Sequence, residues 1–252
     1  MDALKRTLIE KAGHDFGFEY TVRETPNSLV LGSARHPLHA EITIDNTGYQ
    51  VRLINAKPLL IDELKRDFAV THSTSLLCPS IEQLAAFFKR TAALAQSLPN
   101  QAEHNFEAAL VVELEKLPDS IKNTEIERLV RQRVGQNAYR KAMLDYWGGA
   151  CAVTGVAIPE ILRASHALPW AECETDAQRL DVFNGFLLTA NLDALFDRFL
   201  ISFDKAGIIM ISDLVSAKDR TFLGLSANLQ LRWLTEQHEN YLGLHRARLQ
   251  SD

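Results

Sequence analysis

The chain has 252 residues, 46% of them hydrophobic and 23% charged, with a formal net charge of −5. This composition is typical of a globular protein, and the length favours more than one domain. No segment approaches the length of a membrane span and no signal peptide is recognisable, so we expect a cytoplasmic protein outside the membrane. Three widely separated cysteines, Cys78, Cys151 and Cys173, indicate a reducing compartment. The negative charge argues against strong non-specific coating of DNA.

Residues 1–68 are predicted to form a small α+β module. Apolar residues at helical spacing indicate a helix over 2–12, which Gly13 would end. Four strand-like runs follow, with a hairpin signature between the last two: 18–23, 28–34, 39–44 and 49–54. We therefore expect the helix to pack on a four-stranded antiparallel sheet, with a second short helix at 59–67.

Three polar residues of this module, Arg35, His36 and His39, allow two interpretations. They could form a metal or catalytic site, but they are also typical of a polar loop between two strands, which we favour. Arg23, Arg35 and Arg52 could instead lie near one edge of the sheet and contact phosphate.

Residues 69–118 are predicted to be a helical connector. The segment up to Pro79 is rich in Ser and Thr, and Ser80 is expected to cap a helix that reaches about Gln96. Proline and asparagine at 99–100 break this helix, and another is expected over about 103–117.

The next predicted helix carries an excess of basic residues. Thr124 should cap it, with Glu127 at the capping-box position, and Gly135 is a candidate for a bend. We expect contacts with DNA phosphates on this helix, and the alternative is an ordinary solvated face. The basic residues are Lys122, Arg128, Arg131, Arg133, Arg140 and Lys141, of which Arg128, Arg131, Arg140 and Lys141 are the predicted contacts.

The pattern that points most directly to a chemistry lies at 151–204. Short apolar strands are predicted at 161–167 and 183–189, and apolar residues at helical spacing follow over 190–199. In such a β-β-α unit, His166 ends the first strand and can face Asp193 and Asp197, which share one face of the helix. A neutral imidazole can activate water, and carboxylates can hold a divalent cation that offsets charge on a phosphodiester.

These residues resemble the HNH endonuclease family of ββα-metal nucleases, in its variant with Asp-x-x-x-Asp on the helix. The run 124–155 also resembles the lead-in helix of that group, so the resemblance covers about 124–213. It implies that His166 is the general base and that Asn184 braces the loop holding this base. It further implies metal ligands at Asp193 and Asp197, with Mg²⁺ or Mn²⁺ as cofactor and DNA as substrate.

Two features depart from the family pattern. Many members place a second metal-binding Asp just before the base, where this chain has Ser165, a weaker ligand. Many members also bind a structural zinc through two Cys-x-x-Cys pairs, and only one thiol remains at those positions, so no structural zinc is expected. The four positions hold Cys151, Thr154, Thr189 and Leu192. Packing should hold the unit together instead, through Trp147, Phe183, Leu187, Leu195 and Phe196.

The last part of the chain is predicted to close the nuclease unit. A hairpin is expected from 201–203 and 208–211, and Ser226 should cap a final helix that extends to about 249. His238 and His245 on this helix are interpreted as surface residues.

The sequence thus predicts an α+β protein with a recognition module at 1–68, a helical connector at 69–118 and an HNH nuclease domain at 119–252. The expected function is metal-dependent DNA endonuclease, in a restriction-modification or defence setting, with target choice by the N-terminal module. One alternative is a non-catalytic DNA-binding or regulatory protein that keeps the fold, which Ser165 and the negative net charge suggest. Another is a nuclease toxin effector. Since one ββα unit cuts one strand, cleavage of both strands implies a homodimer or two sequential events.

Overall fold

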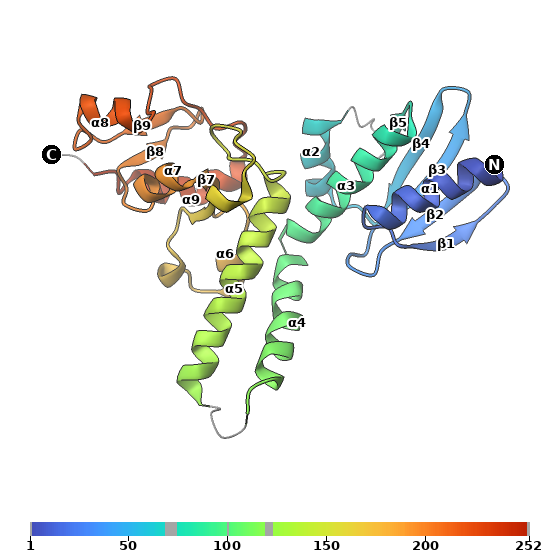
Figure 1. Cartoon of the computed structure of the whole chain (residues 1–252), viewed down its shortest axis with the longest axis horizontal. Coiled ribbons are helices and arrows are strands. Elements are labelled where there is room, and N and C mark those ends of the chain that lie inside the picture. The colour runs from blue at the N-terminus through green and yellow to red at the C-terminus, as the bar shows by residue number, and fades with distance from the viewer. Residues whose placement is uncertain (1, 69–74, 100, 119–122, 251–252) are drawn as a thin grey trace. The chain divides into compact units, whose positions relative to one another are not determined.

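The computed structural model describes residues 2–68, 75–99, 101–118 and 123–250 and divides into two compact units, Met1–Leu98 and Pro99–Asp252. Both units combine helices with antiparallel strands, which confirms the predicted α+β class (Figure 1). The first helix predicted in the connector belongs to the N-terminal unit and the second to the C-terminal unit. Within the described parts of the chain, no helix is long and apolar enough to cross a membrane.

The N-terminal unit is built on a five-stranded antiparallel sheet in the order β1-β2-β3-β4-β5. The sequence predicted one strand fewer, because β5 falls in the Ser- and Thr-rich segment that we interpreted as a connector. Only Leu76 and Cys78 of β5 are buried, and so short an alternation is hard to recognise in a sequence. The elements are α1 (Ala3–Asp15), β1 (Tyr20–Glu24), β2 (Ser28–Gly32), β3 (His39–Asp45), β4 (Gly48–Ile54), α2 (Pro58–Asp67), β5 (Ser75–Cys78) and α3 (Ile81–Ser97).

Helices α1 and α3 lie side by side over one face of this sheet (Figure 1). Ser80 caps α3 as predicted, and its hydroxyl accepts a hydrogen bond from the Gln83 amide at 3.3 Å. Helix α1 continues past Gly13, where a Cβ would lie 2.4 Å from a methyl group of Leu31. Gly13 therefore lets α1 approach the sheet closely and does not end the helix. The core between the layers includes Ile9, Phe18, Ala40, Ile42, Val51, Leu84, Phe87 and Phe88.

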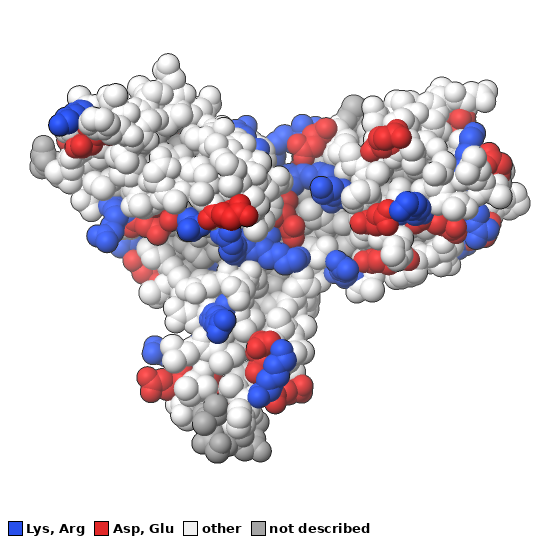
Figure 2. All heavy atoms as spheres, viewed as in Figure 1, with Lys and Arg blue, Asp and Glu red and all other residues white. Residues whose placement is uncertain are grey.

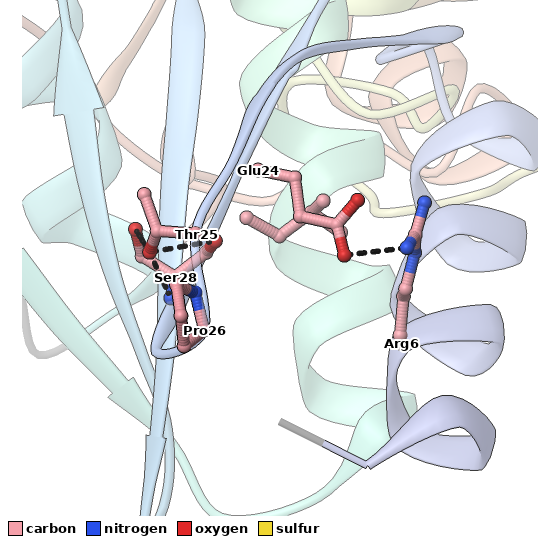
Figure 3. A pocket seen from close by; sticks show the side chains of 6 residues that line it. Arg6, Glu24, Thr25, Pro26 and Ser28 are labelled. Atoms are coloured by element: carbon pink, nitrogen blue, oxygen red, sulfur yellow. Dashed lines mark hydrogen bonds and ion pairs between the residues drawn. The ribbon is translucent and has the colours of Figure 1, made fainter.

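A hollow of about 360 Å³ lies beside the turn between β1 and β2. Figure 3 shows Glu24 pointing toward Arg6 on α1, and an oxygen of Glu24 lies 2.5 Å from an Arg6 nitrogen. The hydroxyls of Thr25 and Ser28 bond to each other across the turn at 2.9 Å. The charged groups that line this hollow thus neutralise each other, which leaves no net charge to attract a ligand.

The C-terminal unit carries the predicted nuclease segment. Helices α4 and α5 form a pair whose far ends extend away from the rest of the unit (Figure 1). The strands form two separate antiparallel pairs, β6 with β7 and β8 with β9. The elements are α4 (Gln101–Glu115), α5 (Thr124–Tyr146), η2 (Pro159–Ile161), β6 (Leu162–His166), η3 (Trp170–Glu172), α6 (Asp176–Leu180), β7 (Gly185–Thr189), α7 (Ala190–Phe196), β8 (Ile201–Phe203), β9 (Ile209–Ile211), α8 (Ala217–Phe222) and α9 (Glu236–Arg246).

Helix α5 differs from its prediction in two respects. Asn123 caps it in place of Thr124, and the Asn123 side chain accepts hydrogen bonds from the backbone amides of Glu125 (3.1 Å) and Ile126 (2.9 Å). The helix also runs unbroken through Gly135, where a Cβ would lie only 2.5 Å from the Trp170 ring. Gly135 therefore makes room for Trp170 and does not interrupt the helix.

Aromatic packing stabilises the C-terminal unit, and the side chains predicted to pack together are all buried: Trp147, Phe183, Leu187, Leu195 and Phe196. Trp147 stacks on Trp233 with ring centroids 4.2 Å apart. Tyr146 meets the edge of Phe183 at 5.5 Å. Burial of so many large apolar side chains gives the unit a hydrophobic core of its own.

The predicted final helix over 226–249 is wrong in its first half, because α9 begins only at Glu236. The preceding residues form an extended segment that bonds to other parts of the unit. The Leu231 amide donates to the Gly207 carbonyl and the Arg232 amide to the Ala152 carbonyl, at 2.9 and 2.7 Å. These long-range backbone bonds replace the local bonds of a helix, and local sequence does not reveal them.

Candidate functional site

The candidate site is built on the hairpin of β6 and β7 and on α7, which follows β7 without a loop. His166, the last residue of β6, pairs with Gly185, the first of β7. Ser165, just before the base candidate, pairs with Phe186. The site therefore lies at the end of the two-stranded sheet where residues 167–184 connect β6 to β7.

The imidazole of His166 is held on several sides. Its ring stacks on the Tyr139 ring at 3.8 Å between centroids, and Trp170 meets it edge-on at 5.6 Å. Its Nε2 lies 2.9 Å from the Arg179 carbonyl oxygen. The neutral ring therefore donates its Nε2 proton to this carbonyl and keeps its lone pair on Nδ1.

The protein environment favours the neutral form of this ring. Burial lowers the pKa of His166 to about 4, and the bond to the Arg179 carbonyl opposes the shift only in part. At neutral pH the ring is thus unprotonated. An unprotonated imidazole with one free nitrogen can accept a proton from water.

The carboxylates of α7 lie one helical turn apart, and the Asp197 amide donates to the Asp193 carbonyl at 2.9 Å. The hydroxyl of Ser165 donates a hydrogen bond to a carboxylate oxygen of Asp193. Although Asp197 is exposed, partial burial of its carboxylate and the nearby charge of Asp193 raise its pKa to about 6, against the weaker influence of Arg198. A carboxylate whose pKa is raised by a second carboxylate nearby is suited to bind a cation, because the cation relieves the repulsion.

His166 and Asp197 line the same surface hollow of about 270 Å³. Asp193 and Ser165 are bonded to each other and lie outside its lining. The structure thus brings the candidate base and one predicted metal ligand to a common opening. The hollow is lined by Ala164, His166, Pro169, Trp170, Asp197, Phe199 and His245.

The donor atoms at this site fit a hard divalent cation. Mg²⁺ is commonly held by one or two carboxylates, with water and substrate phosphate completing its coordination, and Asp193 and Asp197 supply such a pair. In the part of the chain that the structure describes, no group of three or more His, Cys, Asp or Glu is placed to hold a metal ion. Magnesium or manganese would therefore depend on water and phosphate for its remaining ligands.

The donor set does not fit a tetrahedral zinc site. Of the four positions considered above, only Cys151 carries a thiol. Cys151 is fully buried, and its sulfur accepts from the amides of Val153 (3.5 Å) and Thr154 (3.4 Å). Zinc in structural sites takes four protein ligands, which one thiol cannot supply.

Asn184 ties the loop between β6 and β7 together. It is fully buried, and its Oδ1 accepts from the Leu168 amide at 2.7 Å. Its Nδ2 donates to the carbonyls of Gln178 (3.0 Å) and Leu168 (3.3 Å) and approaches the Cys173 sulfur at 3.4 Å. Both ends of one amide are therefore used to fix the loop that follows His166. The role of Asn184 in catalysis stays a prediction.

The predicted phosphate contacts on α5 have different surroundings. Arg131 forms an ion pair with Asp176, and Lys141 pairs with Asp145 at 3.3 Å. Arg140 donates to the carbonyls of Leu162 (2.7 Å) and Pro159 (2.8 Å), and so holds the start of β6. Arg128 is exposed, and Lys122 lies outside the described residues.

The arginines of the N-terminal unit form ion pairs with acidic residues. Arg23 and Arg52 both pair with Glu41, and Arg35 pairs with Glu19 at 3.3 Å. Each remaining arginine of this unit likewise has an acidic partner, and Figure 2 shows positive and negative side chains beside one another over its visible face. These remaining pairs are Arg6 with Glu24, Arg66 with Glu63 and Arg90 with Asp67.

Two histidines that we predicted at the surface are buried, so that prediction is wrong. His245 is 1% exposed, stacks on Phe196 at 3.7 Å and lines the hollow beside His166. His238 is fully buried and lies parallel to Phe186 at 5.6 Å. His238, Leu242 and His245 lie on one face of α9, and all three are buried. This helical spacing around an apolar residue is the sequence signal that indicates their burial.

The polar cluster at 35–39 does not form a site. His36 is 5% exposed and meets the edge of the Phe18 ring at 5.0 Å. His39 belongs to β3, and Arg35 pairs with Glu19. The three side chains are thus used separately, in packing, in the sheet and in an ion pair.

Comparison with known proteins gives one result for function. A search of curated proteins finds no significant match. Residues 151–204, which include His166, Asn184, Asp193 and Asp197, match the family model described as HNH endonuclease. The C-terminal half of this chain therefore carries an HNH endonuclease domain.

Proposed function

We propose that this protein is a metal-dependent DNA endonuclease that hydrolyses phosphodiester bonds. The observation that carries the proposal is the common hollow of His166 and Asp197, with Asp193 one turn away on α7. This arrangement supports a site with a general base on one side and oxygen ligands for a cation on the other. The matched family agrees with this chemistry.

In the proposed reaction, Nδ1 of His166 accepts a proton from the attacking water. A bound phosphodiester is negative, and its charge would raise the pKa of the adjacent imidazole from about 4 toward neutrality, where a general base works best. Asp193 and Asp197 would hold Mg²⁺ or Mn²⁺. When bound, the ion offsets the negative charge that develops on the phosphate and the leaving oxygen.

The test is a plasmid-nicking assay with Mg²⁺, with Mn²⁺ and with a chelator. Cleavage should require the metal, and His166→Ala should lower the rate by roughly 10²–10⁴, the usual contribution of acid–base catalysis. His104→Ala, at an exposed position on α4, is the matched control and should cut normally. Near-normal cleavage by His166→Ala would contradict the assignment of the base.

A specific contact favours a second candidate, a non-catalytic DNA-binding or regulatory protein. The Ser165 hydroxyl bonds to Asp193, where an aspartate would instead add a ligand. The same assay separates the two candidates. Specific DNA binding without metal-dependent nicking, by a protein whose fold is intact, would favour the non-catalytic role.

We further propose that the N-terminal unit chooses the target, in a restriction or defence setting. All of its arginines are ion-paired, so recognition there would depend on shape and hydrogen bonds more than on bulk attraction to phosphate. A fragment of 99–252 keeps α4 beside α5 and should nick DNA with little preference. Full selectivity in that fragment would assign the N-terminal unit to docking a partner, as in a toxin effector.

One ββα unit cuts one strand, so cleavage of both strands needs either two units or two successive cuts. We therefore expect either a homodimer on DNA or two sequential nicks. Light scattering of the protein with and without duplex DNA distinguishes these cases. Double-strand breaks that appear only after nicked circles have accumulated would favour sequential cutting by a monomer.

A further inference from the structure

The ring of His166 is fixed mainly by a side chain from outside the hairpin. Tyr139 of α5 is 2% exposed, and its ring lies nearly parallel to the imidazole, at an angle of 21° and a centroid distance of 3.8 Å. The Arg179 carbonyl fixes one ring nitrogen in its plane but does not restrain the tilt of that plane. A stacked aromatic ring supplies this second restraint.

The hydroxyl of Tyr139 reaches past the imidazole to the backbone of both strands. It donates to the Asn184 carbonyl at 2.9 Å and lies 3.4 Å from the Ser165 carbonyl. These carbonyls belong to the residues immediately before Gly185 and His166, which face each other across the sheet. One side chain thus contacts the ring of the candidate base and the backbone that carries it.

The backbone at this point is adapted to the contact. Gly185 has a φ of +146°, and a Cβ there would lie 1.9 Å from the Ser165 carbonyl oxygen and 2.6 Å from the Tyr139 hydroxyl. Only glycine leaves room for the tyrosine and the two strands to meet. Arg140, the next residue of α5, binds the carbonyl of Leu162 at the other end of β6. Helix α5 therefore anchors both ends of the strand that presents His166.

We propose that Tyr139 is a positioning residue for His166, which fixes the plane of the imidazole by stacking and the end of β6 by its hydroxyl. This inference rests on the proposed nuclease function. Catalysis by a base depends strongly on its placement, and a shift of about 1 Å can cost on the order of 10² in rate. Loss of the Tyr139 ring should therefore act on the chemical step and leave binding of DNA and metal intact.

Three variants of the full-length protein test the proposal. Tyr139→Leu removes both restraints, while Tyr139→Phe keeps the stacked ring and removes only the hydroxyl. Tyr146→Phe is the matched control, because it removes a fully buried tyrosine hydroxyl from the same helix. That hydroxyl accepts a bond from the Trp233 indole at 3.2 Å, in the aromatic core. Each variant is compared in kcat, in KM for duplex DNA and in melting temperature.

We expect Tyr139→Leu to lower kcat by on the order of 10² with KM and Mn²⁺ affinity unchanged. Tyr139→Phe should recover most of this loss, and Tyr146→Phe should keep the wild-type kcat even if its melting temperature falls. Equal kcat values in Tyr139→Leu and Tyr146→Phe would overturn the proposal. If Tyr139→Leu does not fold, the two phenylalanine variants are compared with each other. A kcat for Tyr139→Phe that is no lower than the kcat for Tyr146→Phe then overturns the proposal.

A spectroscopic readout separates this inference from the proposed function. The Tyr139 ring should shift the carbon-bound ring protons of His166 upfield in NMR spectra of the metal-free protein. The shift should persist in both phenylalanine variants and disappear in Tyr139→Leu. If the wild-type protein cuts no DNA, the proposed function is wrong, and this shift alone tests the positioning geometry. An unchanged His166 spectrum in Tyr139→Leu would overturn it.

Discussion

Ser165 on β6 donates a hydrogen bond to the carboxylate of Asp193 on α7, and so joins the strand of the candidate base to the helix of the candidate ligands. Ser165 is 2% exposed. The contact places position 165 next to Asp193, although its own hydroxyl is a weak ligand. A carboxylate at this position would add a third acidic group to the pair.

Ser165→Asp should therefore raise the affinity for Mn²⁺, measured by calorimetric titration. Without metal it should lower the melting temperature, because a buried carboxylate would face Asp193 without compensation. Ser165→Asn, which is similar in shape and uncharged, should show neither change. Equal Mn²⁺ affinity in Ser165→Asp and the wild type would contradict an ion at Asp193.

The raised pKa of Asp197, about 6 in the folded protein against an ordinary value of 3.8, gives a pH-dependent prediction. The folded state disfavours the charged carboxylate, so this group lowers stability fully above pH 6 and has no effect below about pH 4. Asp197→Asn should raise the melting temperature at pH 7 in metal-free buffer, and the gain should vanish by pH 4. A constant gain at all pH values would contradict the assigned shift.

Asn184→Ala should reduce the cleavage rate while Mn²⁺ affinity stays near that of the wild type. Its amide fixes the backbone of Leu168 and Gln178 and contacts no carboxylate of the candidate site. Asn191→Ala is the control, since this asparagine is exposed and its side chain donates to the Leu223 carbonyl at 3.2 Å, away from the loop after His166. Loss of metal binding with an unchanged rate per bound ion would instead assign Asn184 to the ion site.

Gly185→Ala should destabilise the protein far more than Gly155→Ala. Both glycines have positive φ, +146° and +71°, but a Cβ at Gly185 would collide with the Ser165 carbonyl, while one at Gly155 meets nothing within 4 Å. Gly155→Ala should cost about 1 kcal/mol from backbone strain alone, and Gly185→Ala clearly more. Denaturant unfolding of both variants measures the difference, and equal costs would contradict the close approach.

Besides His166, two buried histidines should make the protein sensitive to acid. Burial lowers the pKa of His36 and of His245 to about 4, from an ordinary value of 6.5. The unfolded chain therefore takes up protons first, and stability should fall as the pH drops from 6.5 to 4, by at most about 3 kcal/mol per ring. Unfolding free energies at several pH values test this.

Leucine variants of these histidines should behave differently. Neither ring nitrogen of His36 has a hydrogen-bond partner among the described residues, so His36→Leu should be neutral at pH 7 and stabilising at pH 5. His245 bonds to the Ser202 hydroxyl and the Phe196 carbonyl, both at 3.0 Å. His245→Leu should cost about 1–3 kcal/mol at pH 7, because it leaves these groups unsatisfied. If both leucine variants change the free energy of unfolding at pH 7 by the same amount, the hydrogen bonds described for His245 are contradicted.

Most local structure was readable from the chain itself. The strands β3 and β4 alternate clearly, and the Asp-Asn-Thr-Gly turn between them has the chemistry of a hairpin. Ser80 before an amphipathic run marked the start of α3. Such features depend on interactions between near neighbours, which a sequence displays directly. One error was local, the cap of α5 at Asn123, and the larger errors fell where distant segments decide, at β5, at the start of α9 and at the buried face of α9.

The sequence by itself determined the fold class and the recognition of an HNH endonuclease segment, because the order of His166, Asn184, Asp193 and Asp197 is a linear pattern. Only the tertiary structure decided which groups surround the base. Tyr139 stacks on His166 from a helix distant in the chain, and His245 reaches the same hollow from the last helix. An ion pair with Asp176 and backbone carbonyls likewise engage Arg131 and Arg140, two of the predicted phosphate contacts. These contacts arise when separate elements pack together, so no local spacing encodes them.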